Sequence, residues 1–238
     1  MSHTWFISDL HLDPSRPAVT RAFRAFLDSH RDCAALYILG DLFEAWIGDD
    51  DDAPLGREVA ASLADFSRSG PSVFLMRGNR DFLLGEAFCE RAGGELLPDP
   101  SVIDLYGQPV LLMHGDSLCT ADTAYQDFRA MARSPDWQAD LLARPLAERR
   151  ALASQLRDIS QEANSNKAED IMDVTPSEVE RVMQEHGVNC LIHGHTHRPQ
   201  LHRQDQGTRW VLGDWHDHAW IIRASAEGIN LRKLHINQ

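Results

Sequence analysis

Short apolar runs alternate with helix-like segments along the first half of the chain. Between about residues 5 and 115 the runs are WFISDLHL, ALYILGDLF, SVFLMRGNRDF and PVLLMHGD. The segments between them repeat apolar residues at helical spacing, which predicts helices over about 17–30, 54–69 and 82–92. Strands that alternate with helices are typical of a largely parallel sheet, so this pattern predicts an α/β fold.

Residues 121–170 lack this strand pattern. They are rich in Ala, Arg, Leu and Gln and repeat apolar residues at helical spacing, which predicts two to four helices. We interpret the segment as a helical cap inserted into a core made of residues 1–120 and 171–238. A chain of 238 residues is long enough for one core with such an insertion, and two full domains are less favoured.

The strand pattern returns in the last part of the chain. After a predicted helix near 176–187, the run NCLIHGHTH is typical of a buried strand, and RWVLGDW, AWIIRAS and INLRKLHI follow it. We expect the last three runs to be consecutive antiparallel strands that form a second sheet.

Composition narrows the class of protein. The formal net charge is −13, from 36 acidic and 23 basic residues, which argues against binding to nucleic acid. The four cysteines show no C-x-x-C spacing, and the first residues lack the pattern of a signal peptide, so we expect a cytoplasmic protein. No apolar run is long enough to cross a bilayer, so we expect no membrane-spanning segment. Peripheral contact with a membrane surface is still compatible with the sequence.

Polar residues of the kinds that bind metals follow five of the predicted strands. Asp9 and His11 end the first run, and their spacing of two predicts that both side chains lie on one side of an extended segment. Because ligands of open α/β sheets bind at the carboxyl ends of the strands, we expect one shared site. The full set is Asp9, His11, Asp41, Asn79, His114, His195 and His197.

The chemistry of this set favours two metal ions. Carboxylate, imidazole and amide ligands without thiolate suit Mn²⁺, Fe or Zn²⁺ in an open site. Seven ligands are too many for one ion, and two ions about 3.5–4 Å apart can hold a shared hydroxide and clamp a phosphate. If Asp41 bridges, the two groups are Asp9, His11, Asp41 and His197, and Asp41, Asn79, His114 and His195.

Taken singly, each of these residues could equally cap a loop. Two neighbouring features have structural explanations that we favour. His193 lies on a buried-looking strand, which favours a structural hydrogen bond, and Asp49–Asp52 lack the Gly and Glu of a calcium loop, which favours a solvated acidic turn. His216 and His218 follow another strand, and we place them at the rim of the site.

The order of the motifs D-x-H, GD, GNRD, HGD and GHTH, each after an apolar strand, resembles the calcineurin-like metallophosphoesterase superfamily. The resemblance implies a sandwich of two mixed β-sheets flanked by helices, with a dinuclear metal site at the strand ends. A non-catalytic interaction scaffold on the same fold is the alternative of another class. We expect such a scaffold to have lost ligands, and this chain keeps all seven.

Three longer stretches, ALYILGDLFEAWIGDDD, MHGDSLCTADTAYQDFRA and EANSNKAEDIMDV, resemble the UDP-2,3-diacylglucosamine hydrolase family of the lipid A pathway. That resemblance implies two Mn²⁺ ions and a metal-bridged hydroxide that attacks the α-phosphorus, which gives UMP and 2,3-diacylglucosamine 1-phosphate. It implies catalytic roles for Asp41, Asn79, Arg80, His114 and His195. It implies substrate binding by Asn79, Arg80, Asp122, Ser160, Asn164, Lys167 and His195.

Physical arguments agree with these roles. Arg80 can neutralise phosphate charge, and Ser160, Asn164 and Lys167 recur at spacings that share one helix face, although a solvated face has the same spacing. Residues 124–168 carry seven basic and six acidic side chains in an acidic protein, so we expect any contact with the cytoplasmic face of the inner membrane to use the cap. Ordinary cap packing, a soluble nucleotide or phosphodiester as substrate, and protein phosphatase activity are the alternatives, and we expect no obligate protein partner.

Overall fold

Two β-sheets form the centre of the molecule. A computed structural model describes residues 2–165 and 171–236, and within α6 it leaves out the side chains of residues 160–165. In these ranges the first sheet has six strands in the order β11-β10-β1-β2-β3-β4. Their bounds are β1 (His3–Ile7), β2 (Ala35–Leu39), β3 (Ser72–Met76), β4 (Glu95–Leu97), β10 (His218–Ser225) and β11 (Gly228–His235). Strands β1 to β4 run parallel, whereas β10 is antiparallel to both β1 and β11.

The second sheet has the order β5-β6-β7-β9-β8 over the same described ranges. Its three inner strands β6, β7 and β9 are parallel, and the edge strands β5 and β8 are antiparallel to their neighbours. The bounds are β5 (Ser101–Leu105), β6 (Gln108–Leu112), β7 (Cys190–His193), β8 (Gln200–Gln204) and β9 (Gly207–Val211). Both sheets are mixed, as the sequence resemblance implied.

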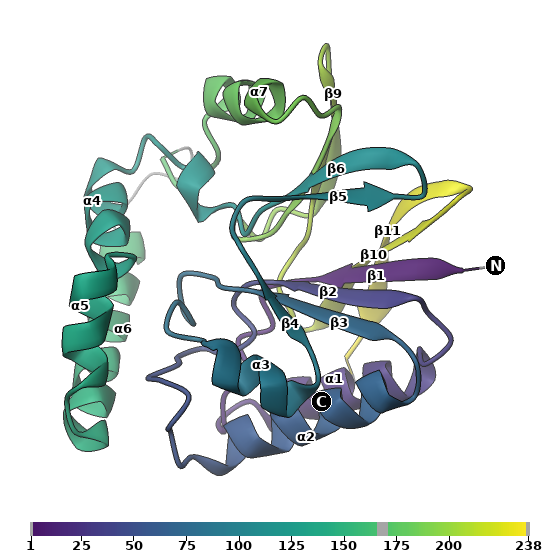
Figure 1. Cartoon of the computed structure of the whole chain (residues 1–238). Coiled ribbons are helices and arrows are strands. Elements are labelled where there is room, and N and C mark those ends of the chain that lie inside the picture. The colour runs from purple at the N-terminus through teal and green to yellow at the C-terminus, as the bar shows by residue number, and fades with distance from the viewer. Residues whose placement is uncertain (1, 166–170, 237–238) are drawn as a thin grey trace.

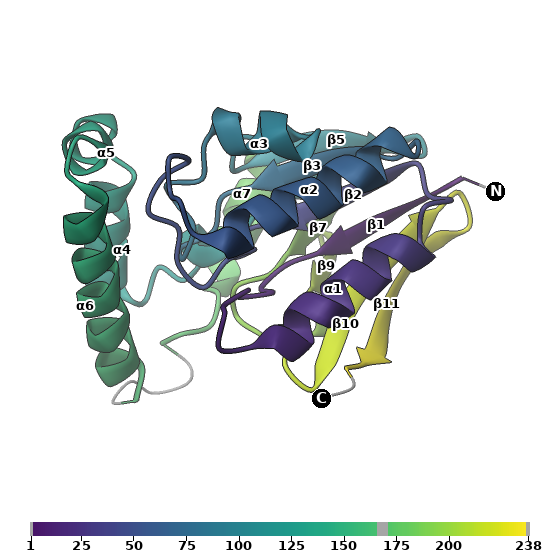
Figure 2. The same cartoon turned by 90° about the horizontal axis from the view of Figure 1, so that it is seen from below.

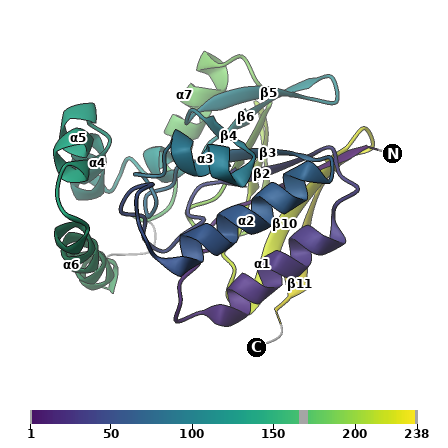
Figure 3. The same ribbon diagram turned by 60° about the horizontal axis from the view of Figure 1, so that its bottom comes forward.

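Helices cover the outer face of each sheet. Helices α1 (Pro17–Ser29), α2 (Pro54–Arg68) and α3 (Glu86–Ala92) pack on the first sheet (Figures 1 and 3). Helix α7 (Pro176–Glu185) covers the second sheet, next to the short 3-10 helix η1 (Asp116–Leu118). Helices α1, α2 and α7 each begin at a proline, whose fixed φ and missing N–H suit the first helical position.

The apolar core between the sheets explains why they face each other. Phe6 and Ile222 of the first sheet and Leu112 and Ile192 of the second are fully buried there. Burial of each such side chain contributes about 1.5–3 kcal/mol. One apolar cluster packs helices α1, α2 and α3 against the first sheet, and another packs α7 against the second. The molecule is therefore a four-layer sandwich, which confirms the predicted fold class.

The prediction for the last strands was wrong in part. β9 enters the second sheet beside β7, whereas β10 and β11 cross over and extend the first sheet beyond β1. An apolar pattern shows that a segment is a strand but does not name its partner. The helix expected at 82–92 also begins later, at Glu86, because residues 77–85 form a loop at the end of β3.

Three helices stand beside the carboxyl ends of the strands: α4 (Thr123–Ala132), α5 (Pro135–Leu142) and α6 (Leu146–Ser165). They form a separate layer at the opposite end of the molecule from the N-terminus (Figures 1 and 2). The helices expected in this segment are confirmed over its described part. We propose that residues 1–120 and 171–238 form a core and that residues 121–170 form a cap. Helices α4, α5 and α6 are called the cap below.

The acidic run Asp49–Asp52 joins the cap to the core. Arg149 of α6, only 3% exposed, binds the carboxylate of Asp50 and the carbonyl oxygen of Ile47. Arg150 binds Asp51 and Asp52, and Asp49 accepts from backbone N–H groups at the start of α3. The expectation of a solvated turn holds in part, since the side chains of Asp50 and Asp52 are 62% and 72% exposed, but it missed their arginine partners in α6, which lie about 100 residues further along the chain.

Candidate metal centre

The loops after β1 and β2 run side by side at the edge of the first sheet. His11 N donates to Asp41 O at 2.9 Å, and Leu12 N donates to Leu42 O at 2.9 Å. Glu44 N donates back to Leu12 O at 3.1 Å. These bonds extend the pairing of two parallel strands into their loops, so the side chains carried there hold fixed positions relative to each other.

An unusual backbone marks the candidate ligands. Within the described ranges six residues other than glycine have positive φ, and all except Tyr106 belong to the predicted metal set: Asp9, His11, Asp41, His195 and His197. Left-handed backbone is unfavourable for such residues and collects at functional sites. The sequence argument from spacing in an extended strand was wrong for Asp9 and His11, because β1 ends at Ile7 and tight left-handed turns bring the two side chains together.

Two glycines allow these loops to touch. A Cβ atom on Gly78 would lie 2.0 Å from Asp41 Oδ1, and one on Gly194 would lie 2.3 Å from Asp9 Oδ2. Both distances are far below van der Waals contact, so a larger residue at either position would displace a candidate ligand. The absence of a side chain at these two glycines therefore lets the loops approach each other at the site.

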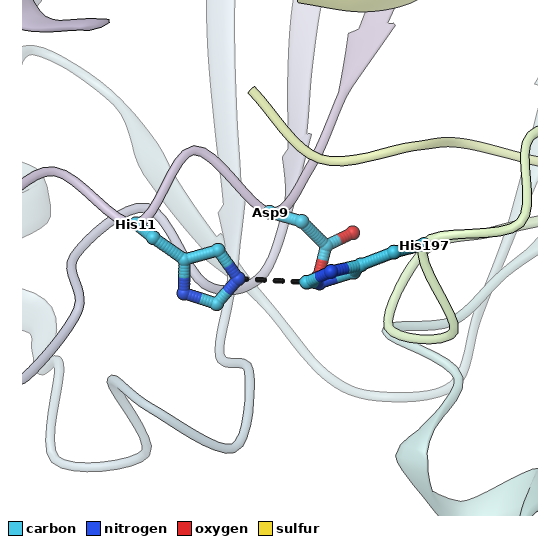
Figure 4. A group of neighbouring side chains, drawn as sticks. All are labelled: Asp9, His11 and His197. Atoms are coloured by element: carbon cyan, nitrogen blue, oxygen red, sulfur yellow. Dashed lines mark hydrogen bonds and ion pairs between the residues drawn. The ribbon is translucent and has the colours of Figure 1, made fainter. Parts of the chain in front are cut away.

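The first group of candidate ligands is Asp9, His11 and His197 (Figure 4). His11 Nε2 is 3.3 Å from His197 Nε2, and His197 Nε2 is 3.4 Å from Asp9 Oδ1. Asp9 is fully buried; its Oδ2 accepts bonds from Ser8 and from His195 N, while its Oδ1 has no hydrogen-bond partner. A buried carboxylate oxygen that faces two imidazole nitrogens fits a divalent cation.

The second group is Asn79, His114 and His195. Asn79 Oδ1 lies 2.9 Å from His114 Nε2 and 2.8 Å from His195 Nδ1. The other ring nitrogen of His114 donates to the carbonyl oxygen of Leu39 at 2.9 Å. In the neutral form that can bind a metal, that bond places the proton on Nδ1 and leaves the lone pair of Nε2 directed at the site.

Asp41 lies between the two groups. Its Oδ2 is 3.8 Å from His11 Nε2, and its Oδ1 is 3.8 Å from His114 Nε2. One carboxylate thus faces a member of each group, which is the arrangement expected of a bridging ligand. Asp9 also lies within reach of Asp41 and His114, which gives the second group an additional oxygen that the sequence argument did not assign to it.

The electrostatics of the site favour added positive charge. Burial alone lowers the pKa of His114, but the carboxylates of Asp41, Asp116 and Asp9 outweigh it and raise that pKa to about 9. Burial raises the pKa of Asp9, yet the nearby imidazole of His197 and the charges of His114 and His11 hold it well below its ordinary value. Bound cations would supply the charge that these buried carboxylates otherwise draw from protonated imidazoles.

Asp81 supports the site, although the sequence argument gave it no role. It is fully buried, and its carboxylate accepts from the backbone N–H groups of Asp41, Leu42, Phe43 and Gly78. One side chain therefore ties the loop after β2 to the loop after β3. Its place in the quoted motif GNRD was the only signal, because backbone partners leave no trace in a sequence.

A cavity of about 510 Å³ leads from the metal groups to the cap. On one side it is lined by His11, Asp41, Asn79, His195 and His197. On the other side it is lined by apolar cap residues, Phe128, Leu141, Leu152, Leu156 and Ile159. Trp46 and Phe82 of the core loops lie along its wall, so a ligand there would meet metal-type groups and apolar side chains together.

The predicted substrate-binding residues divide into three sets. Asn79, Arg80, Asp122 and His195 line the cavity, and Asp122 also caps α4 by accepting from Tyr125 N at 3.1 Å. Ser160 and Asn164 lie in the last turns of α6, where the structure describes the backbone alone. Lys167 lies outside the described residues. The shared face proposed for these last three residues stays a prediction.

The neighbouring histidines differ in role. His193 is fully buried, donates from Nδ1 to Gly194 O at 2.9 Å and accepts from Arg209 at Nε2. Burial and the charge of Arg209 lower its pKa to about 3, which agrees with the expected structural role. His216 and His218 are not among the residues that line the cavity, and their place at the rim of the metal site stays a prediction.

Comparison with known proteins agrees with the fold and the site. Residues 2–199 match the family model described as calcineurin-like phosphoesterase. The structure of an archaeal phosphodiesterase has the same fold, with a TM-score of 0.50 at 13% identity over 98% of this chain and 99% of that chain. The chain belongs to the calcineurin-like phosphoesterase family and is a metal-dependent phosphoester hydrolase.

Two relatives with high sequence identity indicate which group of phosphoesterases the chain belongs to. UDP-2,3-diacylglucosamine hydrolase of Cellvibrio japonicus is 59% identical over 97% of this chain and 98% of that protein. The enzyme of the same name from Pseudomonas aeruginosa is 56% identical over 94% of this chain and 95% of that protein. Within the phosphoesterases, the chain belongs to the UDP-2,3-diacylglucosamine hydrolases. This confirms the sequence-based expectation of an enzyme over a scaffold.

Proposed function

We propose that this chain hydrolyses the pyrophosphate bond of UDP-2,3-diacylglucosamine by attack of water on the α-phosphorus. The products are UMP and 2,3-diacylglucosamine 1-phosphate, in the pathway to lipid A. The observation that carries the proposal is the single cavity that joins the metal groups to the apolar cap residues. A charged pyrophosphate and two acyl chains on one molecule require both environments side by side.

The seven predicted ligands are the residues that would hold two divalent cations, which we propose to be Mn²⁺. When bound, such ions make water nucleophilic at neutral pH and withdraw charge from phosphate oxygens. The unpartnered Asp9 Oδ1 fits this use, and so does the His114 ring, whose Nδ1 bonds to Leu39 O while its Nε2 points at the site. The oxygen- and nitrogen-rich donor set without thiolate fits Mn²⁺.

Arg80 and His195 would position the phosphate. Arg80 lines the cavity beside Asn79, so its guanidinium can hold the phosphate oxygens by charge-assisted hydrogen bonds. Burial and the charge of His114 lower the pKa of His195 to about 4, so this imidazole stays neutral at pH 7. We assign Asp122, Ser160, Asn164 and Lys167 to substrate binding, on the family resemblance.

The proposal is tested by incubating the protein with UDP-2,3-diacylglucosamine and Mn²⁺ in water enriched in oxygen-18. Attack on the α-phosphorus places the label in UMP, whereas attack on the β-phosphorus places it in the lipid phosphate. A UDP-sugar without acyl chains is the matched control, and we expect it to react far more slowly. Equal rates for both substrates would favour the rival function, a phosphoesterase of soluble nucleotides.

We also propose that the cap contacts the cytoplasmic face of the inner membrane. No helix in the described part of the chain has both the length and the apolar character needed to cross a bilayer. Three large apolar side chains of the cap are exposed, Met131 at 45%, Leu142 at 40% and Ile159 at 61%. Such side chains can enter the interface of a bilayer.

The charge argument for this contact weakens in the structure, because several basic side chains of the cap bind core carboxylates. Arg129 binds Asp116, while Arg149 and Arg150 bind the acidic run. We therefore assign the contact to the apolar side chains. The double variant Met131→Ser and Ile159→Ser should sediment less with anionic liposomes than wild type. Val102→Ser, which changes an exposed residue of β5, should sediment as wild type does.

A further inference from the structure

Glu44 lies in the loop after β2, between the first metal group and the cavity. Its Oε2 is 3.1 Å from His11 Nδ1, and its Oε1 is 3.8 Å from Arg80 Nη1. The side chain is 19% exposed and lines the cavity. One carboxylate thus contacts a proposed metal ligand through one oxygen and a proposed phosphate-binding residue through the other.

The contact with His11 decides which ring nitrogen is free. A carboxylate only accepts hydrogen bonds, so a neutral His11 beside it carries its proton on Nδ1. The lone pair then lies on Nε2, the nitrogen that faces His197 Nε2 at 3.3 Å and Asp41 Oδ2 at 3.8 Å. A carboxylate behind a ligating histidine orients the ring and increases its basicity.

The contact with Glu44 also restricts the conformation of the Arg80 side chain. A guanidinium on a long stem has many rotamers, and an ion pair with a fixed carboxylate reduces their number. The backbone of Arg80 is also held, since its N–H donates to Asp41 Oδ1 at 2.7 Å. Arg80 therefore needs little further ordering when a phosphate enters the cavity.

The backbone holds Glu44 where both contacts form together. Glu44 N donates to Leu12 O, one residue after His11. The preceding residue, Phe43, donates its N–H to the buried carboxylate of Asp81. His11, Arg80 and Arg157 lie near the Glu44 carboxylate, and each can carry positive charge.

We infer that Glu44 is a positioning residue that directs His11 Nε2 at the metal and the Arg80 guanidinium at the phosphate. The inference rests on the proposed function of the site and adds to it a residue that links metal binding to substrate binding. If the charge of Glu44 is removed and its oxygen is kept, substrate binding through Arg80 should weaken while metal binding through His11 should change little.

The test compares Glu44→Ala with Glu44→Gln. In Glu44→Ala, the affinity of the metal-free protein for Mn²⁺, measured by calorimetry, should fall about 10–100-fold. Glu44→Gln keeps an oxygen beside His11 Nδ1, so its Mn²⁺ affinity should stay within about threefold of wild type. Its KM for the lipid substrate should rise about two- to fivefold with little change in kcat, as expected for loss of one partly exposed ion pair.

Control variants and a folding assay distinguish a specific effect of Glu44 from a general loss of structure. Glu58→Ala removes an exposed carboxylate that pairs with Arg24 far from the site, and should leave Mn²⁺ affinity unchanged. Thermal unfolding in a chelator checks that each variant is folded. Wild-type affinity for Mn²⁺ in Glu44→Ala would overturn the inference while leaving the proposed function intact. If the wild-type protein itself bound no Mn²⁺, the proposed metal centre would fail instead.

Discussion

The guanidinium of Arg149 binds the carboxylate of Asp50, with Nη1 2.8 Å from Oδ1. This pair joins α6 of the cap to the loop after β2, which also carries Trp46 of the cavity wall. The cavity exists only while the cap and the core keep their relative positions, because each supplies part of the lining. The ion pair therefore links the stability of the cap to the shape of the substrate site.

Arg149→Ala should loosen the cap. The substitution removes bonds to Asp50 and to the carbonyl oxygens of Ile47 and Arg144, at a cost of about 1–3 kcal/mol in the free energy of unfolding. KM for the lipid substrate should rise because one cavity wall is no longer held. Urea denaturation and steady-state kinetics measure both effects. Arg150→Ala, which removes ion pairs of an exposed arginine, is the control and should change the free energy of unfolding less.

The Asp50 carboxylate should make this contribution depend on pH. Its hydrogen bond to Arg149 holds the pKa of Asp50 below the ordinary value of about 3.9. A lowered pKa means that the stabilisation is present above that ordinary value and is lost as pH falls through the lower, folded-state pKa. The difference in unfolding free energy between wild type and Asp50→Asn, both metal-free, should be constant from pH 7 to about 5 and shrink below about 4. A difference that grows on acidification would contradict this assignment.

Asp81→Ala should damage the loops that carry the ligands. It leaves four buried backbone N–H groups without an acceptor, so the free energy of unfolding should fall by more than about 3 kcal/mol. Mn²⁺ affinity should fall as well, since Asp41 is on the loop that Asp81 holds. Asp65→Ala, at an exposed carboxylate paired with Arg31, serves as the control. Near-native stability of Asp81→Ala would show that the loops are held by other contacts.

Asp41→Ala should remove or disorder both metal ions, because Asp41 faces both groups of ligands. Loss of several kcal/mol of transition-state stabilisation should lower turnover by more than about a hundredfold. Lys167→Ala should instead weaken substrate binding and leave the metal content intact. Elemental analysis of the purified variants, together with kinetics, distinguishes the two results. Normal turnover by Asp41→Ala is incompatible with the proposed two-metal centre.

The sequence predicted the candidate ligands because each follows a strand with a strong apolar pattern. Parallel strands place their carboxyl ends at one edge, so residues far apart in sequence, such as Asp9 and His195, could be expected to meet. The supporting residues were missed because their partners are not visible in a sequence. Asp81 binds backbone N–H groups, and Asp50 binds an arginine about 100 residues away.

The prediction for the tail failed for a related reason. The apolar pattern of β10 is that of a strand, but its pairing with β1 depends on which sheet edge is open when the chain has folded. The left-handed backbone of Asp9 and His11 was also beyond the sequence argument, because neither residue is a glycine and nothing local signals a positive φ.

The left-handed backbone at five candidate ligands limits how this protein can be improved. Each such position costs on the order of 1–3 kcal/mol, and together they approach the whole stability of an ordinary domain. A glycine at Asp9 or His197 would relieve the backbone and abolish a ligand in the same step. Engineering for heat resistance therefore has to work through the outer helices and the sheet edges, while the loops at the strand ends stay as they are.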